Sequence, residues 1–167
     1  MSNSQNTESK RAAQLADRIL QGANMLLDYS NKLTDTQWQT PVIGDGRSIG
    51  VVVHHVASVY PIEVELAQVL ASGNNIEGAT KEVIDNMNAE HAENNSKVGK
   101  EETLELLKQN SENASKAVRK FTDQELDNSG KVSLNADAPL TAQFFIEDHA
   151  LRHSFHHLAK IKETIKV

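Results

Sequence analysis

Six of the seven histidines in this 167-residue chain fall in two short clusters. The six are His54 and His55, in VVVHHVASV, and His149, His153, His156 and His157, in and just before ALRHSFHHLAKIKET. Imidazoles are common ligands of zinc, nickel, iron and copper, and several of them held close together can bind one divalent ion. Cysteine is absent, so thiolate zinc sites and a cysteine nucleophile are both excluded. The histidines therefore predict a metal site.

The elements that would position these histidines are predicted to be helices. Apolar residues recur at three- and four-residue spacing, broken by Pro41, Gly44, Gly46 and Gly73. The predicted helices cover residues 12–33, 48–72, 79–95, 101–121 and 140–166, the third being the minor one. No strand pair is expected, although 131–134 could be briefly extended. The pattern predicts an all-α four-helix bundle.

Composition limits the class of protein. With 38% hydrophobic residues, 24% charged residues and a net charge of −6, the chain is typical of one soluble globular domain. It has no basic face for nucleic acid, and no apolar run near 18 residues or signal peptide is evident, so no membrane partner is expected and the predicted location is cytoplasmic. The polar stretch 1–10 is predicted to be disordered, and residues 11–167 to form the domain.

The helical period separates the histidines within each cluster. Adjacent residues differ by about 100° around a helix, which places His55 on the apolar face of 48–72 and His54 on its polar, solvated face. His153 and His157 are four residues apart and stack on one face, where they could grip one ion. His149 and His153 have the same spacing, so the period does not decide the register. The alternatives are a hydrogen-bonded core histidine at 55 and a chance surface pair.

A common site requires a particular topology. His55 lies about 10 Å inside the start of its helix, and His157 about 14 Å before the end of the last helix. These depths match only if the helices 48–72 and 140–166 are antiparallel. The long stretch 73–99 can supply the crossover, which gives an up-down-down-up bundle.

Carboxylates near the histidines could support the ligands. Glu63 lies on the inward side, two turns beyond His55, where it could act as a base or orient a ligand. The alternative is an edge carboxylate paired with Lys or Arg. Asp148, beside His149, has similar status. These three residues are the candidates for groups that contact or support the ligands.

Several motifs, in serial order, resemble the DinB/YfiT-like family of four-helix-bundle metalloproteins. They are SIGVVVHHVAS, IDNMNAEHAE followed by EETLELL, FTDQELD and RHSFHHLAKIKET. The resemblance implies an up-down-down-up bundle that binds a divalent metal through His55, His153 and His157. It therefore favours the 153/157 pair. Family members often carry an aromatic residue where this chain has Arg47.

Three protein ligands leave a coordination position open, which is typical of reactive sites. Zinc, nickel or iron would suit the imidazoles, and any thiol must be an external low-molecular-weight compound. Characterised relatives include thiol-dependent S-transferases and a maleylpyruvate isomerase, so the resemblance implies a metal- and thiol-dependent transferase or a hydrolase acting on a small-molecule substrate. A homodimer is a further expectation. The alternatives are a non-catalytic metal-binding stress-response module and a pH-sensitive histidine interface. An enzyme requires an open site in a cleft, whereas a module predicts an occluded one.

Overall fold

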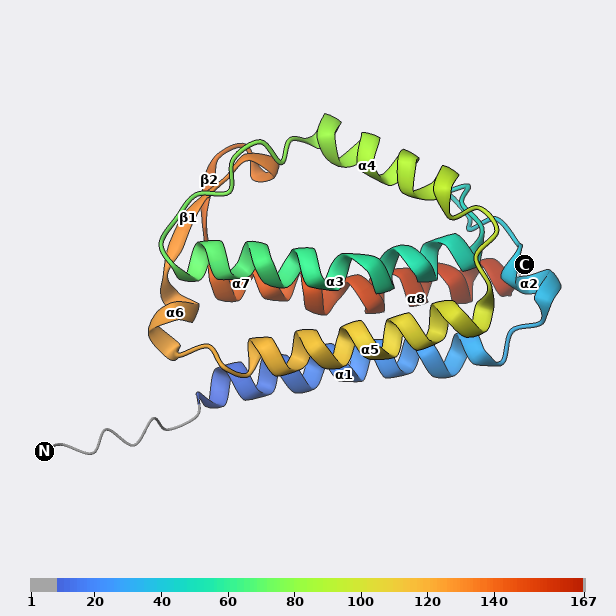
Figure 1. The fold of residues 1–167 in the computed structure, drawn as a ribbon, viewed down its shortest axis with the longest axis horizontal. Coiled ribbons are helices and arrows are strands. Elements are labelled where there is room, and N and C mark those ends of the chain that lie inside the picture. Colours follow the sequence, from blue (N-terminus) through green and yellow to red (C-terminus); the bar gives the residue numbers. More distant parts are fainter. Residues whose placement is uncertain (1–8, 167) are drawn as a thin grey trace, which may run out of the picture.

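Four long helical segments form the body of the molecule in the computed structural model, which describes residues 9–166 (Figure 1). The segments are α1 (Lys10–Asn31), α3 (Ile49–Ala71), α5 (Lys100–Val118) and a last segment composed of α7 (Ala142–Ile146), the π-helical turn η2 (Glu147–Leu151) and α8 (Arg152–Ile165). The predicted all-α four-helix bundle is confirmed. The predicted disorder over 1–10 falls largely outside the described residues, although Ser9 caps α1.

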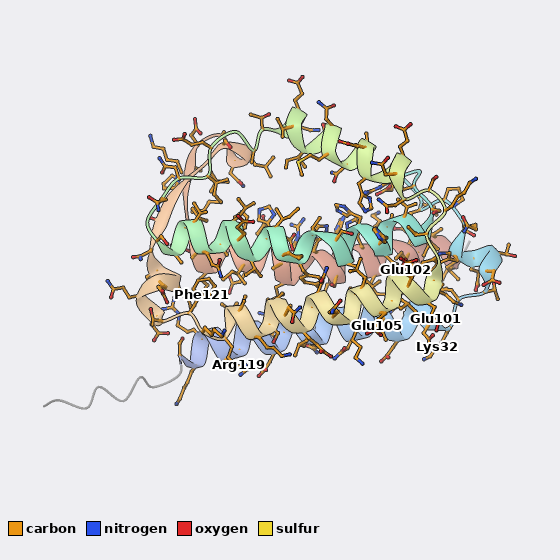
Figure 2. The ribbon with its side chains drawn as sticks, in the orientation of Figure 1. Lys32, Glu101, Glu102, Glu105, Arg119 and Phe121 are labelled. Atoms are coloured by element: carbon orange, nitrogen blue, oxygen red, sulfur yellow. The ribbon has the colours of Figure 1, made fainter. Side chains whose placement is uncertain are left out.

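Contacts along the helices establish their directions. The Lys100 ammonium donates to the Leu33 carbonyl at 2.7 Å, so α5 begins where α1 ends. Figure 2 shows Arg119 at the opposite end of α5. The Asn110 amide donates to the Ala57 carbonyl at 2.8 Å, at similar depths from the starts of α5 and α3. The helices α1 and α5 are therefore antiparallel, and α3 and α5 are parallel.

The last segment runs against α3 and alongside α1. Tyr60 on α3 hydrogen-bonds Ser154 on α8 at 2.5 Å, and His55, nearer the start of α3, lies beside His157, further along α8. The bundle therefore runs up, down, down and up (Figure 1).

The crossover between the parallel helices α3 and α5 carries α4 (Lys81–Asn94). Thr80 caps its first turn by accepting from the Val83 amide. Figure 1 shows α4 lying outside the four-helix body, on the side of α3. None of its residues is buried, so α4 covers α3 without joining the core.

The expectation of no strand pair is wrong. The short helix α6 (Asp123–Asp127) leads into β1 (Ser129–Val132), which pairs antiparallel with β2 (Ala138–Thr141). A 3-10 turn, Ser133–Asn135, joins them, and Ala136 and Asp137 then have positive φ angles of 55° and 60°. Glycine or asparagine usually marks such positions. The hairpin escaped prediction because its strands are short and its two positive-φ positions carry Ala136 and Asp137 instead.

The core consists of the inward faces of the bundle helices, joined by Trp38 of the unpredicted short helix α2 (Asp35–Trp38). The helix α3 is long and apolar enough to cross a membrane by length and composition, but 61% of its most apolar window is buried in the bundle. This burial is that of a core helix, since α3 packs against both α5 and the last segment.

The π-helical turn changes which residues of the last segment face inward. The spacing of the apolar residues in the last helix predicts one buried stripe, made of Phe144, Leu151, Phe155, Leu158 and Ile165. Phe144 is instead 47% exposed, and Phe145 is buried. A π turn adds one residue to the helix, so the face that precedes it shifts by one position. The inward assignment of Phe144 is therefore wrong, whereas Leu151 and Leu158 are buried as predicted.

Replacing Gly130 by alanine is expected to lower the free energy of unfolding by about 1–3 kcal/mol. A Cβ at this position would lie 2.0 Å from the Asn74 carbonyl oxygen, and backbone atoms cannot move aside as a flexible side chain would. Urea denaturation measures the loss. Gly99→Ala is the comparison, because its Cβ would meet nothing within 4 Å. It should lose less stability than Gly130→Ala, since its only cost is that alanine is a poorer N-cap of α5 than glycine. Equal midpoints for Gly130→Ala and the wild type would contradict the close approach.

Candidate metal site and adjoining pocket

Three histidines from two helices meet between α3 and α8. The ligand nitrogens of His55 on α3 and of His153 and His157 on α8 all lie within 4.8 Å of one another. The Nε2 atoms of His55 and His153 are 3.2 Å apart. The centroid of the His55 ring lies 5.0 Å from that of His153 and 5.7 Å from that of His157. The antiparallel packing of α3 and α8 produces this cluster, which is called the histidine triad below.

The π-helical turn decides which histidines can join the triad. It ends at Leu151, so His153 and His157 follow it in regular α-helix and their rings stack at 4.9 Å. His149 lies within the π turn, where the four-residue spacing to His153 no longer corresponds to one α-helical turn. Its ring stacks instead on Phe145 at 4.3 Å. The structure brings the 153/157 pair to His55.

Glu63 holds one member of the triad in place. The Nδ1–H of His153 donates to the Glu63 carboxylate at 2.6 Å, and a carboxylate can only accept in such a bond. The neutral His153 ring therefore carries its proton on Nδ1 and keeps a lone pair on Nε2, the atom that faces His55. Within the described residues, the buried Oε2 of Glu63 has no hydrogen-bond partner, so this carboxylate retains an unused acceptor.

Burial keeps two triad members uncharged. Desolvation lowers the pKa of His55 to about 2 and that of His157 to about 3, with smaller contributions from neighbouring histidines and from Arg47. Both rings are neutral at pH 7, so each offers a nitrogen lone pair without first losing a proton. Neutral imidazole is the form that binds metal ions.

The triad fits a divalent transition metal. Two nitrogens bound at about 2.0–2.1 Å to a tetrahedral ion are about 3.3 Å apart, and the His55 and His153 Nε2 atoms are separated by 3.2 Å. Without an ion, the same separation suits a hydrogen bond from an Nε2–H of His55 to the lone pair of His153. The donors are imidazoles, and a carboxylate orients one of them, as is common for metal-bound histidine.

A pocket of about 340 Å³ adjoins the triad, and all three triad members line it. Its walls come from α3, α4, the hairpin and the last segment. The apolar lining residues are Val59, Ile62, Leu66, Ile76, Ala79, Ile84, Met87, Val132, Leu134 and Phe145. The other lining residues are Arg47, Glu63, Asn88 and His149. The pocket is therefore apolar over most of its lining, with a small set of polar groups that includes the triad.

The DinB superfamily model matches residues 18–161, most of the chain. The protein belongs to the DinB superfamily. Its structure is similar to that of YfiT from Bacillus subtilis, which is described as a probable metal-dependent hydrolase with an unusual four-helix bundle topology. The TM-score is 0.73 and the sequence identity is 18%, and the similarity covers 99% of this chain and 92% of YfiT. At 18% identity, this similarity shows that the two proteins share a fold.

A mycothiol-dependent maleylpyruvate isomerase is also similar to this DinB-superfamily chain, with a TM-score of 0.69 and 10% identity. The similarity covers 90% of this chain but 60% of the isomerase, so the isomerase contains substantial further structure. No curated protein matches the sequence significantly. The activities in the descriptions of YfiT and of the isomerase are those of these two proteins.

The other histidines and the carboxylate considered as site residues lie outside the triad. His54 was expected to be solvated, but it is half-buried and its Nδ1 lies 2.9 Å from Nε2 of His91 on α4. That expectation is wrong because α4 covers the polar side of α3. His149 lines the pocket. Its buried Nε2 lies 3.9 Å from a carboxylate oxygen of Asp148 and has no hydrogen-bond partner among residues 9–166. Asp148 accepts a hydrogen bond from Arg152 at 3.2 Å.

Two groups of lining residues were missed by sequence reasoning. The first is Arg47, which lies in a loop whose path the helical period does not describe. The second is the α4 face that carries Ile84 and Met87. The α4 signal was present, since both residues are apolar and lie on one helical face three residues apart. This signal does not identify what the face packs against, because a minor helix outside the four-helix core has no predictable partner.

Proposed function

We propose that this DinB-superfamily protein binds one divalent metal ion through His55, His153 and His157. The ion would be zinc, nickel or iron, since imidazole suits all three. We further propose that the protein is an enzyme that uses an external low-molecular-weight thiol to attack an electrophilic small molecule. The observation that carries this proposal is that all three triad members line an open, largely apolar pocket. A metal-storing module would instead require an occluded triad.

The side chains of the protein divide the work of such an enzyme. A divalent ion held by three imidazoles would supply Lewis acidity, which lowers the pKa of a thiol or water. Glu63 holds His153 in one tautomer through the 2.6 Å hydrogen bond. Its Oε2 and the Nε2 of His149 have no hydrogen-bond partner in the described structure. Either could accept a proton at the pocket wall. The apolar walls would exclude water.

Two alternatives remain distinguishable from this proposal. Activation of water rather than a thiol would make the protein a hydrolase, and the unpartnered Oε2 of Glu63 supports this second candidate because it could receive a proton from water. A non-catalytic metal-binding stress-response module is the other. The cytoplasmic location and the homodimer stay predictions.

Thiol binding at the triad tests the proposed function. Cobalt-loaded protein titrated with 2-mercaptoethanol, cysteine or glutathione is expected to show a new near-ultraviolet sulfur-to-cobalt charge-transfer band. About one proton per site should be released as the thiol binds. Absorbance spectroscopy follows the band, and a weakly buffered indicator assay follows the proton.

Ethylene glycol is the matched control for 2-mercaptoethanol, because it replaces the thiol by a hydroxyl and should produce no such band. His157→Ala should lose both metal and band. If the thiols leave the spectrum of fully cobalt-loaded protein unchanged, the thiol-dependent reaction is excluded. Ester hydrolysis by the same protein would then favour the hydrolase, and its absence would favour the module.

A further inference from the structure

Arg47 is held beside the pocket with part of its guanidinium unused. Its Nε and Nη2 donate to the two carboxylate oxygens of Asp45 at 2.6 and 2.7 Å. The remaining nitrogen, Nη1, is buried and has no hydrogen-bond partner in the described part of the chain. A buried donor without a partner is costly. Since Arg47 lines the pocket, a bound ligand could supply the missing acceptor.

Asp45 fixes the direction of this free edge. A guanidinium has five N–H donors arranged in a plane, and a bidentate carboxylate uses one edge of that plane. The Asp45 pair occupies the Nε–Nη2 edge, which leaves the edge formed by Nη1 and the second hydrogen of Nη2. This second edge also suits a planar carboxylate. Arg47 is therefore preorganised to bind a second one.

The electrostatics of the pocket also favour an anion. Arg47 and the three triad histidines line the same pocket, so a ligand in that pocket would lie near both. If the triad holds a divalent ion, the positive charges of the ion and Arg47 exceed the negative charges of Asp45 and Glu63 by one. Without the ion the negative charges are in excess by one, so the ion should strengthen carboxylate binding. Among the residues that line the pocket, Arg47 is the sole lysine or arginine, which suits one carboxylate better than a phosphate dianion.

From this geometry we infer that Arg47 is a specificity-determining residue that binds the carboxylate of an amphipathic small-molecule substrate. The apolar part of the molecule would lie against the walls formed by α3, α4 and the hairpin. The volume of about 340 Å³ is roughly twice that of a cavity that accommodates benzene, so the substrate class is a small monocarboxylate with a short alkyl or aromatic body. This inference rests on the proposed function for its use in catalysis, but the contact between Arg47 and a carboxylate does not depend on turnover.

Calorimetric titration with octanoate, and with 1-octanol as its neutral counterpart, tests the inference. Octanoate is expected to bind the wild type, and Arg47→Met to weaken octanoate binding by about 10- to 100-fold. Binding of 1-octanol should change by less than about twofold, because it uses only the apolar walls. Arg152→Met is the matched control, since it makes the same chemical change at an exposed arginine on α8 and should leave both affinities unchanged.

Each titration is carried out on zinc-loaded and on metal-free protein, which separates this inference from the proposed function. If octanoate binding depends on Arg47 in both forms, the carboxylate-binding role of Arg47 is supported even if the thiol test fails. Octanoate binding that requires zinc but is unaffected by Arg47→Met would overturn the role of Arg47. Equal loss of octanoate and 1-octanol binding in Arg47→Met would also overturn it, as would the absence of octanoate binding to the wild type. If Arg47→Met does not fold, Arg47→Lys takes its place. This variant keeps the charge without the planar fork and should still weaken octanoate selectively.

Discussion

Replacing His55 by alanine is expected to reduce bound metal from about one ion per chain to less than about a tenth, whereas His54→Ala should leave it unchanged. The two residues are adjacent but point in different directions. The His55 Nε2 lies 3.2 Å from the His153 Nε2, while the His54 Nδ1 lies 2.9 Å from His91 on α4. Losing one of three ligands leaves too few donors for tight binding.

Elemental analysis of the purified variants, after dialysis against a weak chelator, measures this contrast. His157→Ala should behave like His55→Ala, and His149→Ala should keep its metal because the π turn directs His149 onto Phe145. Circular dichroism shows whether each variant keeps its helix content. Equal metal loss in His54→Ala and His55→Ala would refute the assignment of His55 as the ligand, and metal retention in His157→Ala would remove α8 from the site.

The fold followed from the sequence wherever the helical period was uninterrupted. On α3, the apolar residues around His55 recur regularly, and His55 is indeed buried at 7% exposure. A shared site for His55 and His157 required antiparallel helices, because their depths match only then, and the resemblance to the family favoured the 153/157 pair. Burial and periodicity thus predict which face of a long helix points inward, because the hydrophobic effect acts on that face as a whole.

The errors arose where local geometry departs from that period. Phe144 was placed on the wrong face because one extra residue in the π turn shifts the pattern, and a sequence carries no clear signal for such a turn. The hairpin was missed because Ala136 and Asp137, rather than glycine, adopt positive φ. His54 was called solvated because α4 packs over α3 from outside the core. Arg47 depends on a loop whose path only tertiary contacts determine.

Acidification is expected to destabilise the metal-free protein. The pKa of His55 is about 2 and that of His157 about 3 in the folded state, whereas an unfolded histidine has a pKa of about 6.5. The unfolded chain therefore binds more protons, so stability is fully present above about pH 6.5 and falls as the pH decreases toward the folded pKa values. Between pH 7 and pH 5 each histidine would cost about 2 kcal/mol, or about 4 kcal/mol for the pair.

Urea denaturation of metal-free protein at pH 7.0, 6.0 and 5.0 measures this loss. The double variant His55→Gln, His157→Gln should lose the share of about 4 kcal/mol that these two residues contribute, because glutamine does not titrate. The pH dependence that remains comes from groups such as His54, His91 and His149, whose pKa values burial also lowers. His156→Gln should retain the share of His55 and His157, because His156 is exposed on the same helix. A wild-type free energy of unfolding that stays constant down to pH 5 would mean that the two rings can take up protons in the folded state. Protons would then compete with metal near neutral pH, and the triad would lose the advantage that burial gives it as a binding site.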